Sequence, residues 1–396
     1  MMHTEVFKPD FLQRPSVKTL LQAFPRHATS VRFVGGCVRD ALLGQNPKDL
    51  DLATIYTPEE VLMYLKQHHI KAIPTGIAHG TITALVAGDI FEITTLRRDV
   101  LSHGRHADVA FTMDWYEDAL RRDFTFNAIY LDENGQLFDF CHGIEDLHQG
   151  CVRFIGKASD RIREDALRIL RFFRFHGRFG QGKEPDSIAF EACAELSLLL
   201  KNLSKERVTQ EITALLLLKN PHDAIALMNR SGVWETLFQK KANIGQLCNM
   251  VMWEKKLDLI PGLRRRLWAV YHENRAGLSS LRFKKSYLKQ IEMLEYFVDQ
   301  ERDGRVVAYE GGYDFFEDWT LARVRSEESL SVLKKALKLT RAKVYLSFPL
   351  SGHDIEALGL SGPDVGKCLS QIRLWWIKND MIPDKQACLL KAKSLT

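Results

Sequence analysis

Residues 33–51 read FVGGCVRDALLGQNPKDLD, and this stretch decides the fold of the N-terminal part of the chain. A short apolar β-type run ends at Val34, two glycines follow, and a helix-like stretch closes at Gly44. Two glycines let the backbone approach an anionic ligand closely, and a helix that begins directly after them offers free N–H groups and the positive end of its dipole. The stretch therefore predicts a strand, a phosphate-binding turn at Gly35 and Gly36, and a helix.

Two aspartates, Asp49 and Asp51, end the same stretch inside the β-type run DLDLAT. Residues i and i+2 of a strand share a face, so the two carboxylates would point the same way. Neighbouring carboxylates repel each other unless a cation lies between them, and Mg²⁺ is held by one or two carboxylates together with substrate phosphates. Alone, each motif is more often a plain turn or a solvated strand end. Together they predict nucleotidyl transfer with Mg²⁺ as the cofactor.

The motif GGCVRD followed by DLDL resembles the class II nucleotidyltransferases of the polymerase-beta superfamily. These include CCA-adding tRNA nucleotidyltransferases and bacterial poly(A) polymerases. The resemblance implies that Asp49 and Asp51 are catalytic and bind metal ions, and that Glu92, on a later β-type run, is a third catalytic carboxylate. It also implies that the triphosphate of the nucleotide lies against the glycine turn and Arg39.

A second motif, RRDFTFNA, spans residues 121–128. Arg122 could pair with phosphates, and Asp123 and Asn127, four residues apart, would fall on one face of a helix and could hydrogen-bond a ribose. The plainer interpretation is an amphipathic helix start with a surface charge pair. The string matches the RRDFTxNA element of the resembled family, and this match implies nucleotide binding by all three residues.

A third motif, EDALRILR, spans residues 164–171, and its spacing would place Asp165, Arg168 and Arg171 on one helix face. A salt-bridged, exposed helix is the default interpretation of such spacing. Aspartate only accepts hydrogen bonds and arginine only donates them, which matches the amino group and adjacent ring nitrogen of cytosine and adenine but not of uracil or guanine. A buried mismatch would cost on the order of 2 kcal/mol or more. In the resembled family an EDxxR motif reads the incoming base without a nucleic-acid template, which implies this role for Asp165 and Arg168 and nucleotide binding by Arg171.

Further segments carry less specific signals. Residues 99–111 (DVLSHGRHADVAF) take the place of the family's flexible loop, with Arg105 as its functional group. The segment GPDVG, which begins at Gly362, predicts a turn that opens a helix in a tail resembling that of CCA-adding enzymes. Basic residues of the C-terminal half are candidate contacts to tRNA phosphates: Arg264, Arg265, Arg266, Lys284 and Lys285.

The chain is long enough for several domains, and its β-type runs give way to helical spacing after the first 150 residues. We expect an α/β nucleotidyltransferase head with a polymerase-beta-like mixed sheet and helices at 1–150. An all-α remainder would follow, with a neck at 151–218, a body at 219–345 and a tRNA-binding tail at 346–396. Acidic residues outnumber basic ones in the head and basic residues outnumber acidic ones after it, which suits a polyanionic partner.

The seven cysteines are scattered without a CxxC motif. This pattern argues against a zinc site or a disulfide framework and favours a reducing compartment. No apolar run is long enough to span a bilayer, and the first residues lack the apolar segment of a signal peptide. We expect a cytoplasmic enzyme without membrane contact and without an evident stable protein partner.

The resemblance implies template-independent addition of C, C and A to the 3′ end of tRNA from CTP and ATP, by two-metal nucleotidyl transfer that releases pyrophosphate. A bacterial poly(A) polymerase shares head and neck but typically carries a GRRF-type element where this chain has PTGIAHGTITALVAGD. A CC-adding enzyme stays open, although the loop at 99–111 is complete. From another class, a non-catalytic RNA-binding scaffold would keep the basic body but would have no use for the carboxylate pair.

Overall fold

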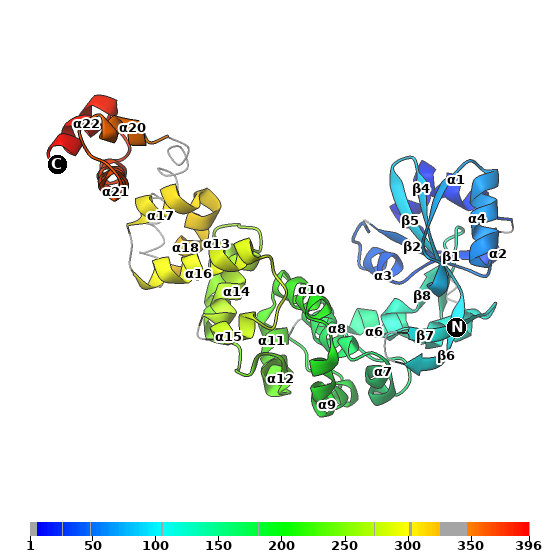
Figure 1. Ribbon diagram of the computed structural model, residues 1–396. Coiled ribbons are helices and arrows are strands. Elements are labelled where there is room, and N and C mark those ends of the chain that lie inside the picture. The colour runs from blue at the N-terminus through cyan, green and yellow to red at the C-terminus, as the bar shows by residue number, and fades with distance from the viewer. Residues whose placement is uncertain are drawn as a thin grey trace. The chain divides into compact units, whose positions relative to one another are not determined.

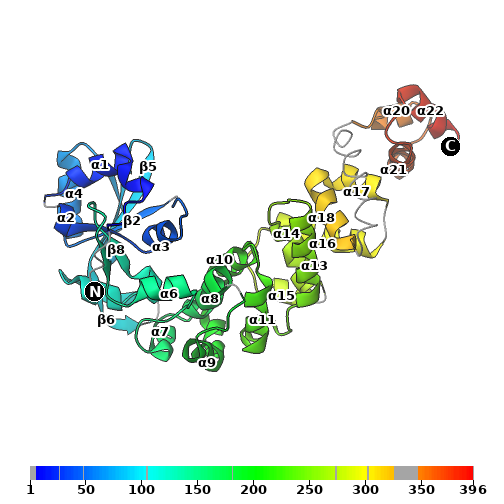
Figure 2. The same ribbon diagram turned by 180° about the vertical axis from the view of Figure 1, so that it is seen from behind.

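The computed structural model describes residues 6–25, 27–47, 49–103, 106–180, 182–272, 274–300, 303–324 and 347–395. The chain divides into two compact units, Met1–Lys241 and Ala242–Thr396. Figures 1 and 2 show the first unit as a sheet with helices followed by further helices, and the second as helices throughout the part that is described.

The first unit is built on a seven-stranded mixed sheet with the order β3-β4-β5-β2-β1-β8-β9. Strand β2 runs parallel to β5, and the other neighbouring pairs are antiparallel. Helix α3 contacts β1, β2 and β8, and α4 contacts β3 and β4. A separate hairpin is formed by β6 and β7. The strands are β1 (Val31–Val34), β2 (Leu50–Thr54), β3 (Lys71–Gly76), β4 (Thr81–Val86), β5 (Asp89–Thr95), β6 (Arg97–His103), β7 (His106–Phe111), β8 (Ile129–Leu131) and β9 (Leu137–Asp139).

Five strands agree with the β-type runs of the sequence, namely β1, β2, β4, β5 and β8. The patterning did not reveal β3, β6, β7 or β9. Strand β3 lies at the edge of the sheet with a largely exposed surface and a proline in its centre, so it lacks the apolar alternation that marks a half-buried strand. The segment expected as a flexible loop at 99–111 is mostly the β6–β7 hairpin, and Arg105 lies outside the described residues.

Short helices fill the spaces around the sheet. Helix α4 begins with a capping box in which the Thr57 side chain and Glu60 satisfy each other's backbone N–H groups, as the TPEE sequence predicts. The helices of the head are α1 (Pro15–Gln22), α2 (His27–Ser30), α3 (Gly36–Leu42), α4 (Pro58–Gln67), α5 (Trp115–Leu120), the 3₁₀ turn η3 (Thr125–Asn127) and α6 (Gly143–Gln149).

Helices α7 to α12 complete the first unit, and a cluster of phenylalanines joins them to the head. The ring of Phe124 lies 4.8 Å from that of Phe154 and 5.5 Å from that of Phe175 in α8, and Phe126 lies 5.4 Å from Phe175. These rings hold the RRDFTFNA segment against the neck. The helices are α7 (Ala158–Glu164), α8 (Leu167–Phe175), α9 (Ser187–Glu195), α10 (Lys205–Leu216), α11 (His222–Arg230) and α12 (Val233–Phe238).

The second unit contains the predicted turn at Gly362, which has φ +59° and precedes Pro363, the first residue of α21. Trp376, Ile372 and Ile377 of this helix share a buried cluster with Val306 of α17. No helix of the described ranges is long and apolar enough to cross a lipid bilayer. The helices are α13 (Ile244–Lys256), α14 (Leu263–Tyr271), α15 (Arg275–Leu278), α16 (Lys285–Asp299), α17 (Gly304–Gly311), α18 (Tyr313–Arg323), α20 (Gly352–Glu356), α21 (Pro363–Lys378) and α22 (Lys385–Lys393).

The arginine cluster of α14 forms a buried ionic network. The guanidinium of Arg266, 1% exposed, lies 2.6 Å from the carboxylate of Glu254 in α13. Arg265, also buried, lies 2.5 Å from Glu254 and 2.9 Å from Asp318, and Arg264 also pairs with Asp318. The expectation that this cluster contacts tRNA needs correction, because the charges of Arg265 and Arg266 face carboxylates in the interior rather than solvent.

We expect Glu254→Gln to lower the free energy of unfolding by roughly 3–5 kcal/mol, because it leaves two buried guanidinium groups without their shared carboxylate. The measurement is urea unfolding of the full chain, with Asp364→Asn as the control. Asp364 pairs with Lys367 at 3.0 Å on the surface, and exposed pairs contribute roughly 1 kcal/mol or less. Equal effects of the two substitutions would show that the buried network is not the stronger of the two.

Candidate functional site

The glycine turn adopts the conformation that the sequence predicts. Gly35 has φ +75° and precedes α3, which begins at Gly36. A Cβ on Gly35 would lie 3.8 Å from Nη1 of Arg122 and 3.8 Å from the carbonyl oxygen of Asn127. Residues other than glycine rarely adopt this φ, so the turn requires glycine. A glycine turn at the start of a helix with an arginine close by is suited to a phosphate chain.

Three carboxylates stand beside this turn. Asp49 directly precedes β2, Asp51 lies within it, and Glu92 is the register partner of Asp51 on the parallel strand β5. Burial, helped by the charges of Glu92 and Asp49, raises the pKa of Asp51 to about 6, although Arg122 opposes the rise. The structure thus brings together the two aspartates and the glutamate that the sequence nominated.

The carboxylates have the chemistry of a magnesium site but do not enclose an ion. Within the described ranges no group of three His, Cys, Asp or Glu side chains is placed to hold a metal by itself. Mg²⁺ commonly takes one or two carboxylates and completes its shell with water and substrate phosphates. Asp49 and Asp51, which lie close enough for the charge of Asp49 to act on Asp51, fit that kind of open site beside the glycine turn.

Two nitrogens of the Arg122 guanidinium are bound within the protein, and the third is available to a ligand. Its Nε and Nη2 donate to the Asp118 carboxylate at 3.2 and 2.9 Å, and Nε also donates to the Tyr130 hydroxyl at 3.2 Å. The remaining nitrogen, Nη1, faces Gly35 and makes no hydrogen bond to any group in the described part of the chain. A fixed guanidinium with one unused edge at a glycine turn is well suited to a phosphate oxygen.

Arg39 was expected to bind the nucleotide, but its contacts in the structure are to other residues of the protein. Its side chain is almost fully enclosed, with Nε and Nη2 on the Asp40 carboxylate at 2.8 and 2.7 Å. Its Nη1 donates to Oδ1 of Asn127 at 2.6 Å, and its guanidinium lies over the ring of Phe175. Arg39 therefore ties α3 to the RRDFTFNA segment and to α8.

Asp123 and Asn127 touch each other, but not on a helix. Asp123 precedes the 3₁₀ turn η3, in which Asn127 is the last residue, and Nδ2 of Asn127 donates to Oδ1 of Asp123 at 2.9 Å. The predicted helix is corrected to this short turn. Arg171 of α8 approaches the other oxygen of Asp123 at 2.6 Å. Burial alone would raise the pKa of Asp123, but the Arg171 guanidinium keeps it below its usual value.

The EDALRILR segment does not form one continuous helix. Helix α7 ends at Glu164, and Asp165 is extended with φ −151° before α8 begins. Asp165, 31% exposed, pairs with Arg207 of α10 at 2.7 Å, whereas Arg168, 14% exposed, pairs with Glu164 at 2.6 Å. The predicted common face is therefore wrong in its geometry, and the two side chains have separate ion partners.

Comparisons with known proteins bear on the whole chain. Residues 31–153 match the family model of the poly A polymerase head domain, and residues 185–243 match that of the probable RNA and SrmB-binding site of polymerase A. A mitochondrial CCA tRNA nucleotidyltransferase 1 from Danio rerio is 34% identical over 391 residues, which cover 91% of this chain and 86% of the relative. The chain belongs to the family of CCA tRNA nucleotidyltransferases.

Other members of this family agree with the assignment. A CCA-adding enzyme from Streptococcus pneumoniae is 31% identical over 371 residues, covering 90% of this chain and 91% of the relative. The crystal structure of the Bacillus stearothermophilus CCA-adding enzyme in complex with CTP superposes with a TM-score of 0.79 at 25% identity, covering 96% of this chain and 98% of that one. The predicted fold class, an α/β nucleotidyltransferase head followed by helices, is confirmed.

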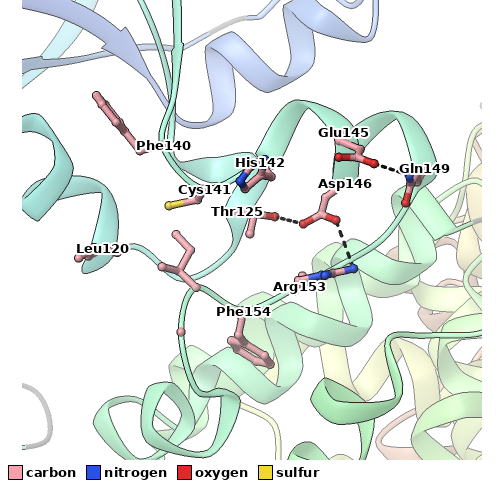
Figure 3. A pocket seen from close by; sticks show the side chains of 12 residues that line it. Leu120, Thr125, Phe140, Cys141, His142, Glu145, Asp146, Gln149, Arg153 and Phe154 are labelled. Atoms are coloured by element: carbon pink, nitrogen blue, oxygen red, sulfur yellow. Dashed lines mark hydrogen bonds and ion pairs between the residues drawn. The ribbon is translucent and has the colours of Figure 1, made fainter. Parts of the chain in front are cut away.

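A cavity of about 500 Å³ is lined by Thr125 of the RRDFTFNA segment, but by none of the residues nominated for the site (Figure 3). The Thr125 hydroxyl donates to Oδ2 of Asp146 at 2.7 Å, and Arg153 lies 3.5 Å from Oδ1 of the same carboxylate. His142 and Cys141 line it from the segment between β9 and α6. The polar groups mostly satisfy one another across the bend between β9 and α6, so we interpret the cavity as part of this bend.

Sequence reasoning missed the residues that support the nominated ones. Asp118 and Tyr130 bind Arg122, Glu211 lies 3.8 Å from Arg171, and none of the three was singled out. For Asp118 a signal existed, because it precedes Arg121 and Arg122 by three and four residues, the spacing of helical ion pairs. Glu211 and Tyr130 reach their partners only through the tertiary fold.

We expect Gly35→Ala to weaken binding of nucleoside triphosphates strongly, because a Cβ at this φ displaces the N–H groups that approach the phosphates. Gly44→Ala is the matched control. Gly44 follows the other end of α3 with φ +71° and has open space around its Cβ position. Gly44→Ala should destabilise the fold by about 1–2 kcal/mol through backbone strain. Gly35→Ala should destabilise it more, because ψ −126° at Gly35 lies outside the left-handed region that alanine can reach. The measurements are thermal unfolding and CTP titration, and similar CTP affinities in the two variants would contradict a phosphate-binding turn.

Proposed function

We propose that the protein adds C, C and A to the 3′ end of tRNA, using CTP and ATP and no nucleic-acid template. The observation that carries this proposal is the meeting of Gly35, Asp51 and Arg122 at one edge of the head. Gly35 lies against the free edge of Arg122, and the charges of Arg122 and Asp51 act on each other. Family membership supports the same activity, since relatives are named CCA tRNA nucleotidyltransferases and CCA-adding enzymes.

In the proposed reaction the tRNA 3′-hydroxyl attacks the α-phosphate of the nucleotide and pyrophosphate leaves. The N–H groups at Gly35 and Gly36 and the free edge of Arg122 bind the triphosphate oxygens. Asp49 and Asp51 would hold Mg²⁺, with Glu92 adding negative charge beside them. When bound, the ion neutralises the triphosphate and favours ionisation of the attacking hydroxyl. These residues thus orient the triphosphate for in-line displacement.

In the same proposal Asp165 and Arg168 read the base. The Asp165 carboxylate accepts from the amino group of cytosine or adenine, and Arg168 donates to the adjacent ring nitrogen. Both side chains already have ion partners, Arg207 and Glu164, which restrict their rotation. Asp123 and Asn127 are the candidates for the ribose, and Arg171 acts on them through Asp123.

Fewer basic residues stay as candidates for contact with tRNA once their ion pairs are considered. Lys284 and Lys285, at the start of α16, are exposed and stay candidate phosphate contacts. Arg264 is partly exposed but pairs with Asp318, so its contribution is weaker. A structure of a Thermotoga maritima CCA-adding enzyme complexed with tRNA shares the fold of this chain, with a TM-score of 0.66 at 20% identity.

The two alternative functions, poly(A) polymerase and CC-adding enzyme, have weaker support. The head matches a model described as that of poly A polymerase, yet relatives aligned over about nine tenths of the chain are CCA enzymes. A CC-adding enzyme would stop after the two cytidines. The cytoplasmic location stays a prediction, because the relatives include mitochondrial enzymes.

The proposed function is tested by supplying tRNA that lacks its 3′ end with one labelled nucleotide at a time and sizing the products. We expect C addition with CTP alone, full CCA with CTP and ATP, and no extension with UTP or GTP. Repeated A addition with ATP alone would favour a poly(A) polymerase. Arrest after two cytidines with both nucleotides present would favour a CC-adding enzyme.

We expect Asp49→Asn and Asp51→Asn each to abolish incorporation while leaving tRNA affinity within a few-fold of the unmodified protein. The substitutions remove charge that serves metal ions in the head and keep side-chain size. The measurements are single-turnover incorporation at saturating Mg²⁺ and tRNA binding by filter retention. A parallel loss of tRNA binding would indicate a structural role instead.

We expect Asp165→Ala and Arg168→Ala to slow the use of CTP and ATP and to relax rejection of UTP and GTP. Each removes one half of the hydrogen-bonding pattern, whose loss is worth on the order of 2 kcal/mol when buried. The measurement is incorporation of all four nucleotides by each variant. Arg163→Ala, which breaks an exposed pair with Asp160 on the preceding helix, is the control. An equal loss for all four nucleotides would reduce the two residues to structural ion partners.

A further inference from the structure

A buried carboxylate that the proposed reaction does not use lies in α5, behind the nucleotide turn. Asp118 is fully enclosed, with 0% of its surface exposed. Its Oδ1 accepts from Nε of Arg121 at 2.9 Å and from the backbone N–H of Arg97 at 3.3 Å. Its Oδ2 accepts from Nη2 of Arg122 at 2.9 Å and from the Tyr130 hydroxyl at 2.7 Å. Both oxygens are therefore saturated by donors from three different elements.

These contacts keep Asp118 charged in the interior. Burial opposes ionisation, but Arg122 and Arg121 lower the pKa of Asp118 to about 2. An ionised carboxylate in a buried position is tolerated only when its charge is matched and its lone pairs are occupied. The site therefore has one low-energy arrangement, in which the two arginines and the tyrosine are fixed around the carboxylate.

This arrangement sets the direction of Arg122. Asp118 takes up Nη2 and shares Nε with Tyr130, so the planar guanidinium has Nη1 left, and that nitrogen faces Gly35. Because a guanidinium is rigid and planar, fixing two nitrogens fixes the third. Tyr130 is the strand partner of Val34, directly before the glycine turn, but its hydroxyl and the Asp118 carboxylate are bound to each other and to Arg122. These two groups therefore act on the phosphate site through Arg122.

Helix α5 also accepts hydrogen bonds from the two ends of the β6–β7 hairpin. Asp118 accepts the N–H of Arg97, the first residue of β6, and Glu117 accepts from the Thr112 hydroxyl, just after β7, at 2.6 Å. The side chain of Arg98 lies 3.9 Å from Glu117. The hairpin base and the phosphate-facing arginine thus share one short helix as their anchor.

We propose that Asp118 is a positioning residue that aims Arg122 at the triphosphate. The inference rests on the proposed function for the identity of the ligand and on the contacts above for the role of Asp118. It concerns the phosphates, which CTP and ATP have in common. Loss of Asp118 should therefore affect both nucleotides equally and should leave base choice and tRNA affinity unchanged.

The test is the Michaelis constant of the full-length protein for CTP on tRNA lacking CCA and for ATP on tRNA ending in CC. We expect Asp118→Asn to raise both constants by the same factor, roughly ten- to hundredfold, the range for a charge-assisted hydrogen bond lost at the nucleotide. Introduced together with Arg122→Ala, it should raise them no further than Arg122→Ala alone, because the two residues act through one contact. Additive effects, unequal factors for the two nucleotides or an equal rise for tRNA would overturn the proposal.

Asp146→Asn is the matched control, since Asp146 is also buried and bonded to a hydroxyl and near an arginine, but in the bend shown in Figure 3. It should lower stability while leaving both constants near their original values. If Asp118→Asn does not fold, Tyr130→Phe removes only the hydroxyl and should raise both constants by a smaller, equal factor; no change would overturn the proposal. An unmodified protein that adds no nucleotide to tRNA would reject the proposed function alone, because direct CTP titration still tests Asp118.

Discussion

The ion pair between Asp123 and Arg171 is the interaction on which the candidate site depends. It joins the segment that follows the head helices to α8 of the neck, at 2.6 Å and largely out of solvent. From Asp123 the contacts continue through Asn127 to Arg39, whose guanidinium is bound to Asp40 at the start of the head. In the proposed function the triphosphate is bound in the head and the base is read in the neck. A nucleotide can meet both sets of residues only if these parts keep a fixed distance, and this chain of polar contacts fixes it.

Polar contacts of this kind hold a geometry better than they stabilise a fold. Buried charges lose hydration, and their mutual attraction roughly compensates that loss, so the net stabilisation is small unless every donor and acceptor is satisfied. Around the network, Phe124, Phe126 and Phe175 pack ring against ring and provide apolar burial that does stabilise. The ring of Phe175 also lies under the guanidinium of Arg171, 5.2 Å from its centre. The aromatic cluster therefore supplies the stability of the head–neck junction, and the ion pair supplies its register.

The sequence predicted features that depend on neighbouring residues better than features that depend on contacts between distant segments. Gly35, Gly36 and the aspartate pair depend on strand and helix periods within one short stretch, so their placement followed from the motif itself. Glu92 meets Asp51 through parallel pairing of β2 with β5, which the motif's resemblance implied but periodicity could not show. Predictions from helical spacing were wrong where the chain is not helical. Asp165 is extended between two helices. Arg265 and Arg266 form ion pairs in the interior with Asp318 and Glu254. A count of charges along the sequence cannot show such pairing.

The separate partners of Asp165 and Arg168 suggest how a protein could select bases without a template. Arg207 and Glu164 restrict the rotation of the two side chains before a nucleotide arrives. Two rigid, oppositely matched groups accept only a base that presents a donor and an acceptor in the corresponding order, because a reversed edge would leave both charged groups facing like groups. A flexible pair could turn aside and tolerate the wrong edge at a smaller loss of free energy. In this interpretation selectivity resides as much in the ion partners as in the residues that touch the base, since they remove the freedom that a mismatch would need.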